Sequence, residues 1–201
     1  MEVNRRTQAE RSATTRAALV SAGRKLFAAN GFAAVGTPAI AAEAGVTRGA
    51  LYHQFEDKTE LFAAVFDEVE QEVTARMVEI VAAAGVTEPM AAIVAAVDAW
   101  FDISAEPEVH RIVLIEAPAA LGWARWRELG VKYTLGMTEQ MLAGAMAVGA
   151  IREQPVRPLA HVLIGAVDEA ALYIASAADP DTARAEMRAI VRQLVDGMVA
   201  R

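Results

Sequence analysis

One short segment of the 201-residue chain contains several side chains that can bind another molecule: Arg48, Tyr52 and His53, with Gly49 beside them. In a helix, Arg48 and Tyr52 lie four residues apart on one side, and Gly49 and His53 extend that side. Arginine on such a face can bind O6 and N7 of guanine, whereas tyrosine and histidine reach phosphates or a thymine methyl group. Glycine permits close approach of another molecule. This combination predicts a helix that enters the major groove of DNA.

Two short helices joined by a tight turn are predicted to position this face. Thr37 is expected to cap the first helix, and Gly45 suits the left-handed conformation that ends it. Thr47 is expected to cap the second helix, which covers residues 48–54. Taken without its flanking sequence, the pair is equally consistent with a helical hairpin that has a mixed polar surface.

The charges of the chain are unevenly distributed. Residues 1–55 contain seven Lys or Arg and three Asp or Glu, whereas residues 56–201 contain twelve and twenty-three, and the net charge is −7. A basic head on an acidic body is typical of a protein that binds DNA with one end only. The alternative is a chance fluctuation of composition.

The composition predicts an all-α protein, because helix-forming residues dominate and 55% of the chain is hydrophobic. The absence of cysteine excludes disulfides and cysteine-ligated metals. We expect no cofactor, no metal and no membrane, since no apolar run approaches the ~20 residues of a membrane span. Residues 1–8 lack the apolar segment of a signal peptide. A soluble cytoplasmic protein is therefore expected.

The N-terminal arm, residues 1–11, contains Arg5, Arg6 and Arg11. It can contact phosphates or the minor groove, or it can be a disordered solubilising tail. A helix over about residues 12–30 follows and braces the two short helices.

A long helix is predicted from Asp57, its N-cap, to about Ala84. Lys58 lies in the first turn, where the N–H groups and the helix dipole already favour an anion, so we expect it to contact a DNA phosphate. This helix starts beside the predicted DNA-binding face and ends in the body. It is therefore the expected mechanical link between the two parts.

The body is predicted to hold further helices. They begin near residue 89, near 106 (interrupted by Pro118), near 121, near 159 and near 179. The helix over about residues 159–178 is apolar on nearly all sides and must be buried on all sides. Its small residues permit close helix approach: Gly165, Ala166, Ala170 and Ala171. We expect the last two helices to form a homodimer interface, the alternative being a single buried helix in a monomer.

Large aromatic residues and methionines gather in the body and suit a cavity for an apolar ligand. The candidate lining residues are Trp100, Phe101, Trp123, Trp126, Tyr133, Met137 and Met141. The candidate polar contacts are His110, Glu116 and Asp168. Plain core packing is the alternative for each residue taken singly.

Residues 12–60 resemble the DNA-binding domain of the TetR family of bacterial transcriptional regulators. The matching positions are Ala22, Phe27, Asn30, Gly31, Phe32, Val35, Thr37, Ile40, Ala41, Ala44, Gly45, Val46, Gly49, Leu51, Tyr52, Phe55, Lys58 and Leu61. The resemblance implies a three-helix helix–turn–helix domain in residues 1–56 and a helical effector-binding and dimerisation domain in residues 57–201. It also implies a phosphate contact at Lys58.

We therefore expect a ligand-responsive regulator. The predicted partners are a double-stranded operator, a small effector and a second copy of the chain. Repression of a palindromic operator, relieved by a small apolar effector, is the preferred mechanism. The predicted DNA contacts are Thr37, Thr47, Arg48, Gly49, Tyr52, His53 and Lys58.

Catalysis has little support from the sequence. No nucleophile elbow, phosphate-binding glycine loop or zinc-binding His-Glu-x-x-His motif is present, and the three histidines lack ligand spacing. A helical-bundle enzyme and a ligand-binding protein without a DNA-binding role are the alternative functions.

Overall fold

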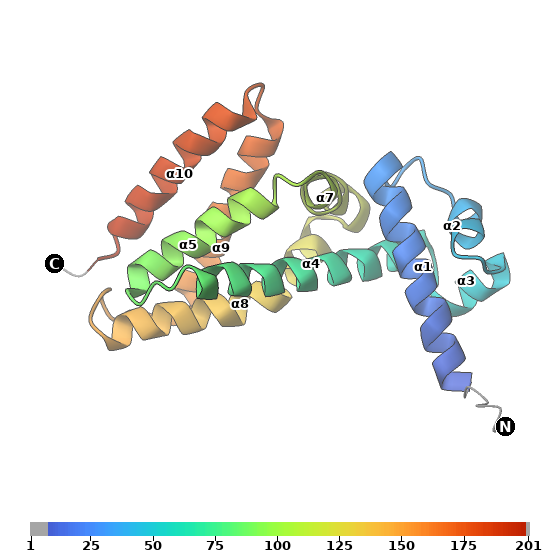
Figure 1. Ribbon diagram of the computed structural model, residues 1–201, viewed down its shortest axis with the longest axis horizontal. Coiled ribbons are helices and arrows are strands. Elements are labelled where there is room, and N and C mark those ends of the chain that lie inside the picture. Colours follow the sequence, from blue (N-terminus) through green and yellow to red (C-terminus); the bar gives the residue numbers. More distant parts are fainter. Residues whose placement is uncertain (1–7, 200–201) are drawn as a thin grey trace.

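The computed structural model describes residues 8–199 and is built from helices throughout this range, which confirms the all-α prediction. Three helices form one end of the molecule: α1 (Gln8–Asn30), α2 (Thr37–Glu43) and α3 (Arg48–Gln54). We call this part the head. Helix α4 (Lys58–Ala83) runs from the head along the length of the remaining part, the body (Figure 1).

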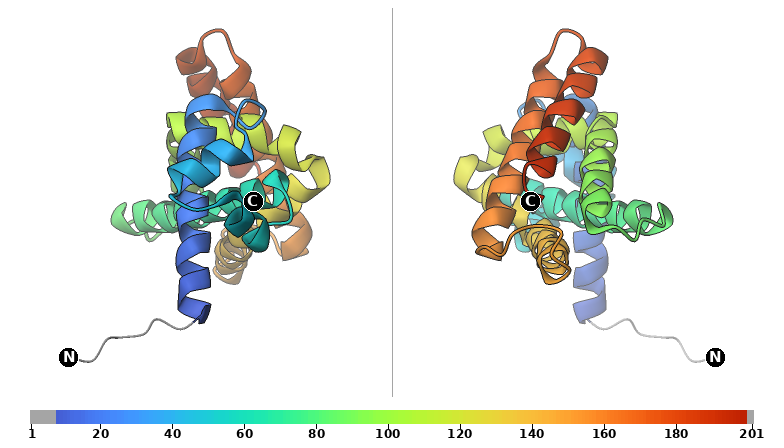
Figure 2. Two further views of the ribbon diagram at one scale, coloured as in Figure 1. Left: turned by 90° about the vertical axis from the view of Figure 1, so that its right-hand side faces the viewer. Right: turned by 90° about the vertical axis from the view of Figure 1, so that its left-hand side faces the viewer.

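The body continues with α5, a run of three short helical segments, and three longer helices. Their bounds are α5 (Pro89–Ile103), α6 (Pro107–Val109), the π-helix η1 (His110–Glu116), α7 (Ala117–Leu121), α8 (Trp123–Ala147), α9 (Val156–Ser176) and α10 (Pro180–Asp196). Helices α5 and α8 flank α4, and α9 and α10 lie side by side away from the head (Figures 1 and 2).

The head folds around the apolar residues that the helical periodicity identified. Phe27, Phe32 and Phe62 form an aromatic cluster in which Phe62 meets each of the other two rings edge-on, with centroids 5.1 and 5.2 Å away. Such tilted pairs contribute about 0.5–1.5 kcal/mol beyond the burial of their area. Leu51 is fully buried and Phe55 nearly so, so α3 packs on the core through the predicted face.

The predicted caps of α3 and α4 are present. The Thr47 hydroxyl accepts a hydrogen bond from the Ala50 amide at 3.1 Å, and the Asp57 carboxylate accepts one from the Glu60 amide at 2.8 Å. The prediction for Thr37 is wrong in detail, because Gly36 is the N-cap residue and Thr37 is the first residue of α2. This frees the Thr37 hydroxyl for a contact described below.

The start of α1 also differs from the prediction. The helix begins at Gln8, so Arg11, which was placed in the N-terminal arm, lies within the first turns of a helix. Arg5 and Arg6 lie outside the described residues. Residues 8–11 are helical and exposed, so the helix starts about four residues before its predicted start at residue 12.

The helical structure is not interrupted at Pro118, contrary to the prediction. The π-helix η1 runs directly into α7, and Pro118 occupies the first turn of α7, where its missing N–H is tolerated. In the π-helical hydrogen-bond pattern, the amide of Ala117 donates to the carbonyl of Ile112, five residues earlier. In the same pattern, the next residue would donate to the carbonyl of Val113, but Pro118 has no N–H. The indole Nε1 of Trp126 donates to this carbonyl instead, at 3.1 Å.

Helix α9 is more apolar than the sequence analysis allowed. By length and composition alone its 21 residues, whose most apolar window of 18 residues has a mean hydropathy of 1.4, are sufficient to cross a membrane, but a single helix of this kind also occurs as a core helix of non-membrane proteins. Only 28% of its most apolar window is buried within the chain. Ala170 and Ala171, expected at a dimer seam, pack inside their own chain and are 4% and 1% exposed.

Candidate nucleic-acid interface and ligand cavity

The outer surface of α3 carries the side chains that were predicted to contact DNA. Thr47, Arg48, Gly49, Tyr52 and His53 are all exposed. An exposed arginine, phenol and imidazole on a short helix that is anchored through its other face satisfy the geometric requirement for a recognition helix.

A hydrogen bond between Thr37 and Tyr52 joins α2 to α3. The two hydroxyl oxygens are 3.1 Å apart. The pKa of Tyr52 is lowered, because the Thr37 hydroxyl and then the Arg48 guanidinium favour the phenolate. The contact fixes the orientation of the phenol beside the arginine, and Thr37 and Tyr52 therefore act as one unit on this surface.

Lys58 is engaged within the protein. Its ammonium donates to the backbone carbonyls of Phe32 and Val35, at 2.8 and 3.0 Å, and lies 4.1 Å from the centroid of the Phe32 ring. These contacts tie the loop between α1 and α2 to the first turn of α4. An ammonium has three donors, so one remains for the predicted phosphate.

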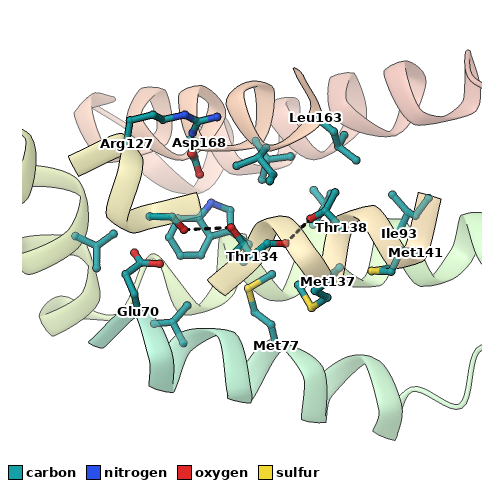
Figure 3. Close-up of a pocket in the computed structure, with 18 of the residues that line it drawn as sticks. Glu70, Met77, Ile93, Arg127, Thr134, Met137, Thr138, Met141, Leu163 and Asp168 are labelled. Atoms are coloured by element: carbon teal, nitrogen blue, oxygen red, sulfur yellow. Dashed lines mark hydrogen bonds and ion pairs between the residues drawn. The ribbon is translucent and has the colours of Figure 1, made fainter. Parts of the chain in front are cut away.

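A large cavity lies in the body between α4, α5, η1, α8 and α9 (Figure 3). The space between its walls amounts to about 900 Å³, including solvent at its mouth. The lining residues are Glu70, Val73, Met77, Ile93, Ala96, Val97, Trp100, Val113, Leu114, Trp126, Arg127, Gly130, Thr134, Met137, Thr138, Met141, Leu142, Leu163, Ile164, Val167 and Asp168. The walls are mostly apolar with a few polar groups, which is typical of a small-molecule site.

Some polar groups of the cavity have hydrogen-bond or ion-pair partners, and others have none among the described residues. Asp168 forms an ion pair with Arg127. Glu70 is only 5% exposed, and no described residue forms a hydrogen bond or ion pair with its carboxyl group. The indole Nε1 of Trp100 is likewise buried without a hydrogen-bond partner among the described residues. Burial raises the pKa of Glu70 to about 8, and the negative charges of Asp168 and Asp67 add to this shift.

Residues 90–198 match the family described as "Tetracyclin repressor-like, C-terminal domain", and residues 19–65 match "Bacterial regulatory proteins, tetR family". The chain belongs to the TetR family. Its members are DNA-binding transcriptional regulators, so the resemblance noted in residues 12–60 is confirmed. The second match covers the C-terminal half of α1, the whole of α2 and α3, and the first two turns of α4.

Similar proteins include a solved TetR-family regulator from Pectobacterium atrosepticum. It is 30% identical, with a TM-score of 0.83 over 98% of this chain and 99% of that one. RolR, solved in complex with resorcinol, is 19% identical, with a TM-score of 0.75 over 96% and 99%. The Transposon Tn10 TetC protein of Escherichia coli is 24% identical over 162 residues, which make up 81% of each chain.

Five of the predicted ligand contacts line the cavity of this TetR-family chain. They are Trp100, Trp126, Met137, Met141 and Asp168. Sequence reasoning missed Glu70, Arg127, Thr134 and Thr138. A signal for Glu70 was available, because it interrupts the apolar stripe of α4 between Phe66 and Val73, where a carboxylate must be buried.

The other five predicted contacts lie elsewhere, and Glu116 among them is described below. Phe101 follows Trp100 on α5 but faces the core, and it is 1% exposed. His110 borders a separate small hollow near Arg184. Trp123 is 62% exposed and packs on Trp126, with ring centroids 4.8 Å apart. Tyr133 lies beneath the ammonium of Lys132 at 4.7 Å, outside the cavity.

Polar contacts join the cavity wall to the head. Glu116, considered for the ligand site, ends η1 and accepts a hydrogen bond from the Phe32 amide at 3.0 Å. Gly31 has a φ of 81°, which side chains rarely adopt, and a Cβ there would displace the Glu116 carboxylate from its present position, so glycine is favoured at this turn. Arg125 of α8 binds both carboxylate oxygens of Glu60 in the first turn of α4, at 2.6 and 2.9 Å.

Arg24 of α1 forms a second connection. Its guanidinium donates to both carboxylate oxygens of Glu108 at 2.8 Å and also pairs with Glu68 and Glu72 of α4. These bonds raise the pKa of Arg24 further above its usual value. The head therefore contacts α4 and the α6–η1 segment through charged groups as well as through apolar packing.

Proposed function

We propose that this chain is a ligand-responsive repressor that binds a palindromic operator as a homodimer and is released by a small, largely apolar effector. The observation that carries the proposal is the position of the cavity. It lies between α4 and η1, and both elements also contact the head. The solved complex of RolR with resorcinol, a fold neighbour, supports a small-molecule effector. We place the protein in the cytoplasm and assign DNA binding to residues 1–56 and effector binding and dimerisation to residues 57–201.

On the DNA side, Arg48 is proposed as the main base-reading residue because it is exposed on α3 and bonded to no carboxylate among the described residues. Thr37, Thr47, Tyr52, His53 and Lys58 hold the DNA backbone, and Gly49 permits close approach.

The dimer forms through α9 and α10. Apolar side chains are exposed on both helices: Val162 (69%), Tyr173 (49%), Ile190 (50%) and Leu194 (56%). Uncovered apolar groups that share one face are typical of an interaction surface. Two copies related by a two-fold axis bury the same surface on each chain and present two recognition helices to an inverted repeat.

An effector acts through the π-helix. Val113 and Leu114 of η1 line the cavity, and Glu116 at the end of the same element holds the amide of Phe32. The carbonyl of Phe32 is in turn held by Lys58. A ligand that displaces η1 therefore changes the support of the loop beside α3. The ligand releases DNA only if it binds the DNA-bound conformation and the DNA-free conformation of the protein with different affinities.

Unbiased selection of DNA sites by the purified protein tests the DNA-binding part of the proposal. Wild type should select an inverted repeat. Arg48→Ala should lose about 1–3 kcal/mol at one position of each half-site and relax the preference there. Equal affinity of Arg48→Ala and wild type for the selected operator would remove Arg48 from the base-reading role.

Linkage tests the effector part. A ligand found by screening is titrated with and without operator, and the fluorescence of Trp100 and Trp126 reports its binding, since both line the cavity. The operator should weaken ligand binding by the same factor by which the ligand weakens operator binding, about 5–150-fold. Equal affinity in both titrations would show that the ligand is not an inducer.

A further inference from the structure

Glu70 is the one polar group of the cavity whose charge has no counter-ion among the described residues. It projects from α4 toward the interior, with Arg127 and Asp168 on the far side (Figure 3). The guanidinium of Arg127 is committed to Asp168 and to the carbonyl of His161. A buried carboxyl group without a partner is destabilising, so such groups in native proteins call for an explanation.

The other groups around Glu70 do not compensate its charge. Asp67, on the same helix, is paired with Lys132 of α8 at 2.7 Å. The residues that α5 and η1 contribute to the cavity are all uncharged: Ile93, Ala96, Val97, Trp100, Val113 and Leu114. The hydroxyls of Thr134 and Thr138 donate to backbone carbonyls one turn back, so they offer only their lone pairs to a ligand. Apart from the unpartnered indole N–H of Trp100, the cavity therefore offers mainly hydrogen-bond acceptors, and it becomes negatively charged when Glu70 ionises.

We propose that the cavity selects apolar molecules that carry a positive charge, an aryl- or alkylamine, and that the Glu70 carboxylate is their counter-ion. This inference rests on the proposed effector role of the cavity and names the class of effector. The aromatic faces of Trp100 and Trp126 and the thioethers of Met77, Met137 and Met141 surround the apolar part of such a ligand. Anions of similar size are disfavoured, because the charge of Arg127 is already paired with Asp168 and Glu70 carries no positive charge in either protonation state.

Three probes of matched shape and different charge test this preference: phenylbutylamine, phenylbutanol and phenylbutanoate. Tryptophan fluorescence gives the affinity of each. The amine should bind tightest, by about tenfold or more over the alcohol, and the carboxylate weakest. Glu70→Gln keeps the shape of the side chain and should reduce the affinity for the amine about tenfold or more, with that for the alcohol changed by less than about threefold. Glu79→Gln is the matched control, because Glu79 is exposed on the same helix outside the cavity.

The pH dependence provides a second measurement on the unaltered protein. The pKa of Glu70 is raised to about 8 in the empty cavity, so binding an ammonium expels the carboxyl proton. The affinity for the amine should therefore rise between pH 6 and 8, by at most about tenfold per unit. The affinity for the alcohol should not rise over that range.

The outcomes separate this inference from the proposed function. If phenylbutanol or phenylbutanoate binds as tightly as the amine, or if Glu70→Gln leaves the affinity for the amine unchanged, the charge preference is overturned. The effector role stands in that case if the tighter probe still weakens operator binding. If none of the three probes binds, both the effector site and its charge preference are overturned.

Discussion

The ammonium of Lys58 holds two backbone carbonyls, and this role is independent of any bound DNA. Lys58→Met keeps the alkyl chain but leaves the carbonyls of Phe32 and Val35 without this donor. Urea unfolding should show a loss of about 1–3 kcal/mol. The control Lys25→Met should change stability by less than about 1 kcal/mol, because the pair of Lys25 with Glu43 is on the surface.

DNA binding by the same variant tests the phosphate contact separately. If Lys58 also binds a phosphate, the slope of affinity against salt should fall by about one for each operator half. An unchanged slope together with a lower unfolding free energy would assign Lys58 to the fold of the head alone.

Glu70 gives the folded state a pH dependence of defined sign. Its pKa is raised from 4.5 to about 8 on folding, so between these values the folded state binds the proton and the unfolded state does not. We therefore compare the free energy of unfolding of wild type with that of Glu70→Gln. The wild-type value minus the variant value should fall as pH rises from about 5 to 8, by at most about 1.4 kcal/mol per pH unit. A constant difference over this range would show that Glu70 titrates normally.

At the scale of elements, the π-helix η1 depends on a donor from another helix. Trp126 of α8 is 4% exposed and supplies the hydrogen bond to Val113 that Pro118 cannot. Trp126→Phe keeps an aromatic ring but removes the donor, and should cost about 1–3 kcal/mol in thermal or urea unfolding. Trp123→Phe, three residues earlier and mostly exposed, should change stability by less than about 0.5 kcal/mol. Equal losses in the two variants would argue against this role of the indole.

At the scale of the whole molecule, the unburied side of α9 and α10 determines the expected assembly. Leu194→Glu introduces a charge on a side chain that is 56% exposed in the single chain, so the chain should fold but remain monomeric and bind operator weakly. Val78→Glu is the control, since Val78 is similarly exposed, at 49%, on α4. Light scattering at micromolar concentration measures both. Ala170→Glu is unsuitable, because Ala170 is buried within its own chain.

The amino-acid sequence alone was sufficient for the helical class, for helices α2 and α3 of the head, and for the N-caps of α3 and α4. These features depend on local periods and on side chains that bond within three residues, as Thr47 and Asp57 do. The family resemblance followed from the same short-range pattern, and the comparisons confirmed it.

The tertiary structure alone decided which side chains enter the cavity. Trp100 and Phe101 are neighbours in one apolar stripe, yet only the tryptophan lines the cavity. Trp123 and Trp126 lie on the same side of α8, yet one is exposed and the other buried. The apolar stripe of α4 signals the burial of Glu70, but the sequence does not show that its carboxyl group lacks a partner or that Lys58 holds two carbonyls. The physical reason is that these contacts join residues far apart in the chain, and periodicity determines the face of a helix but not the partner that the face meets.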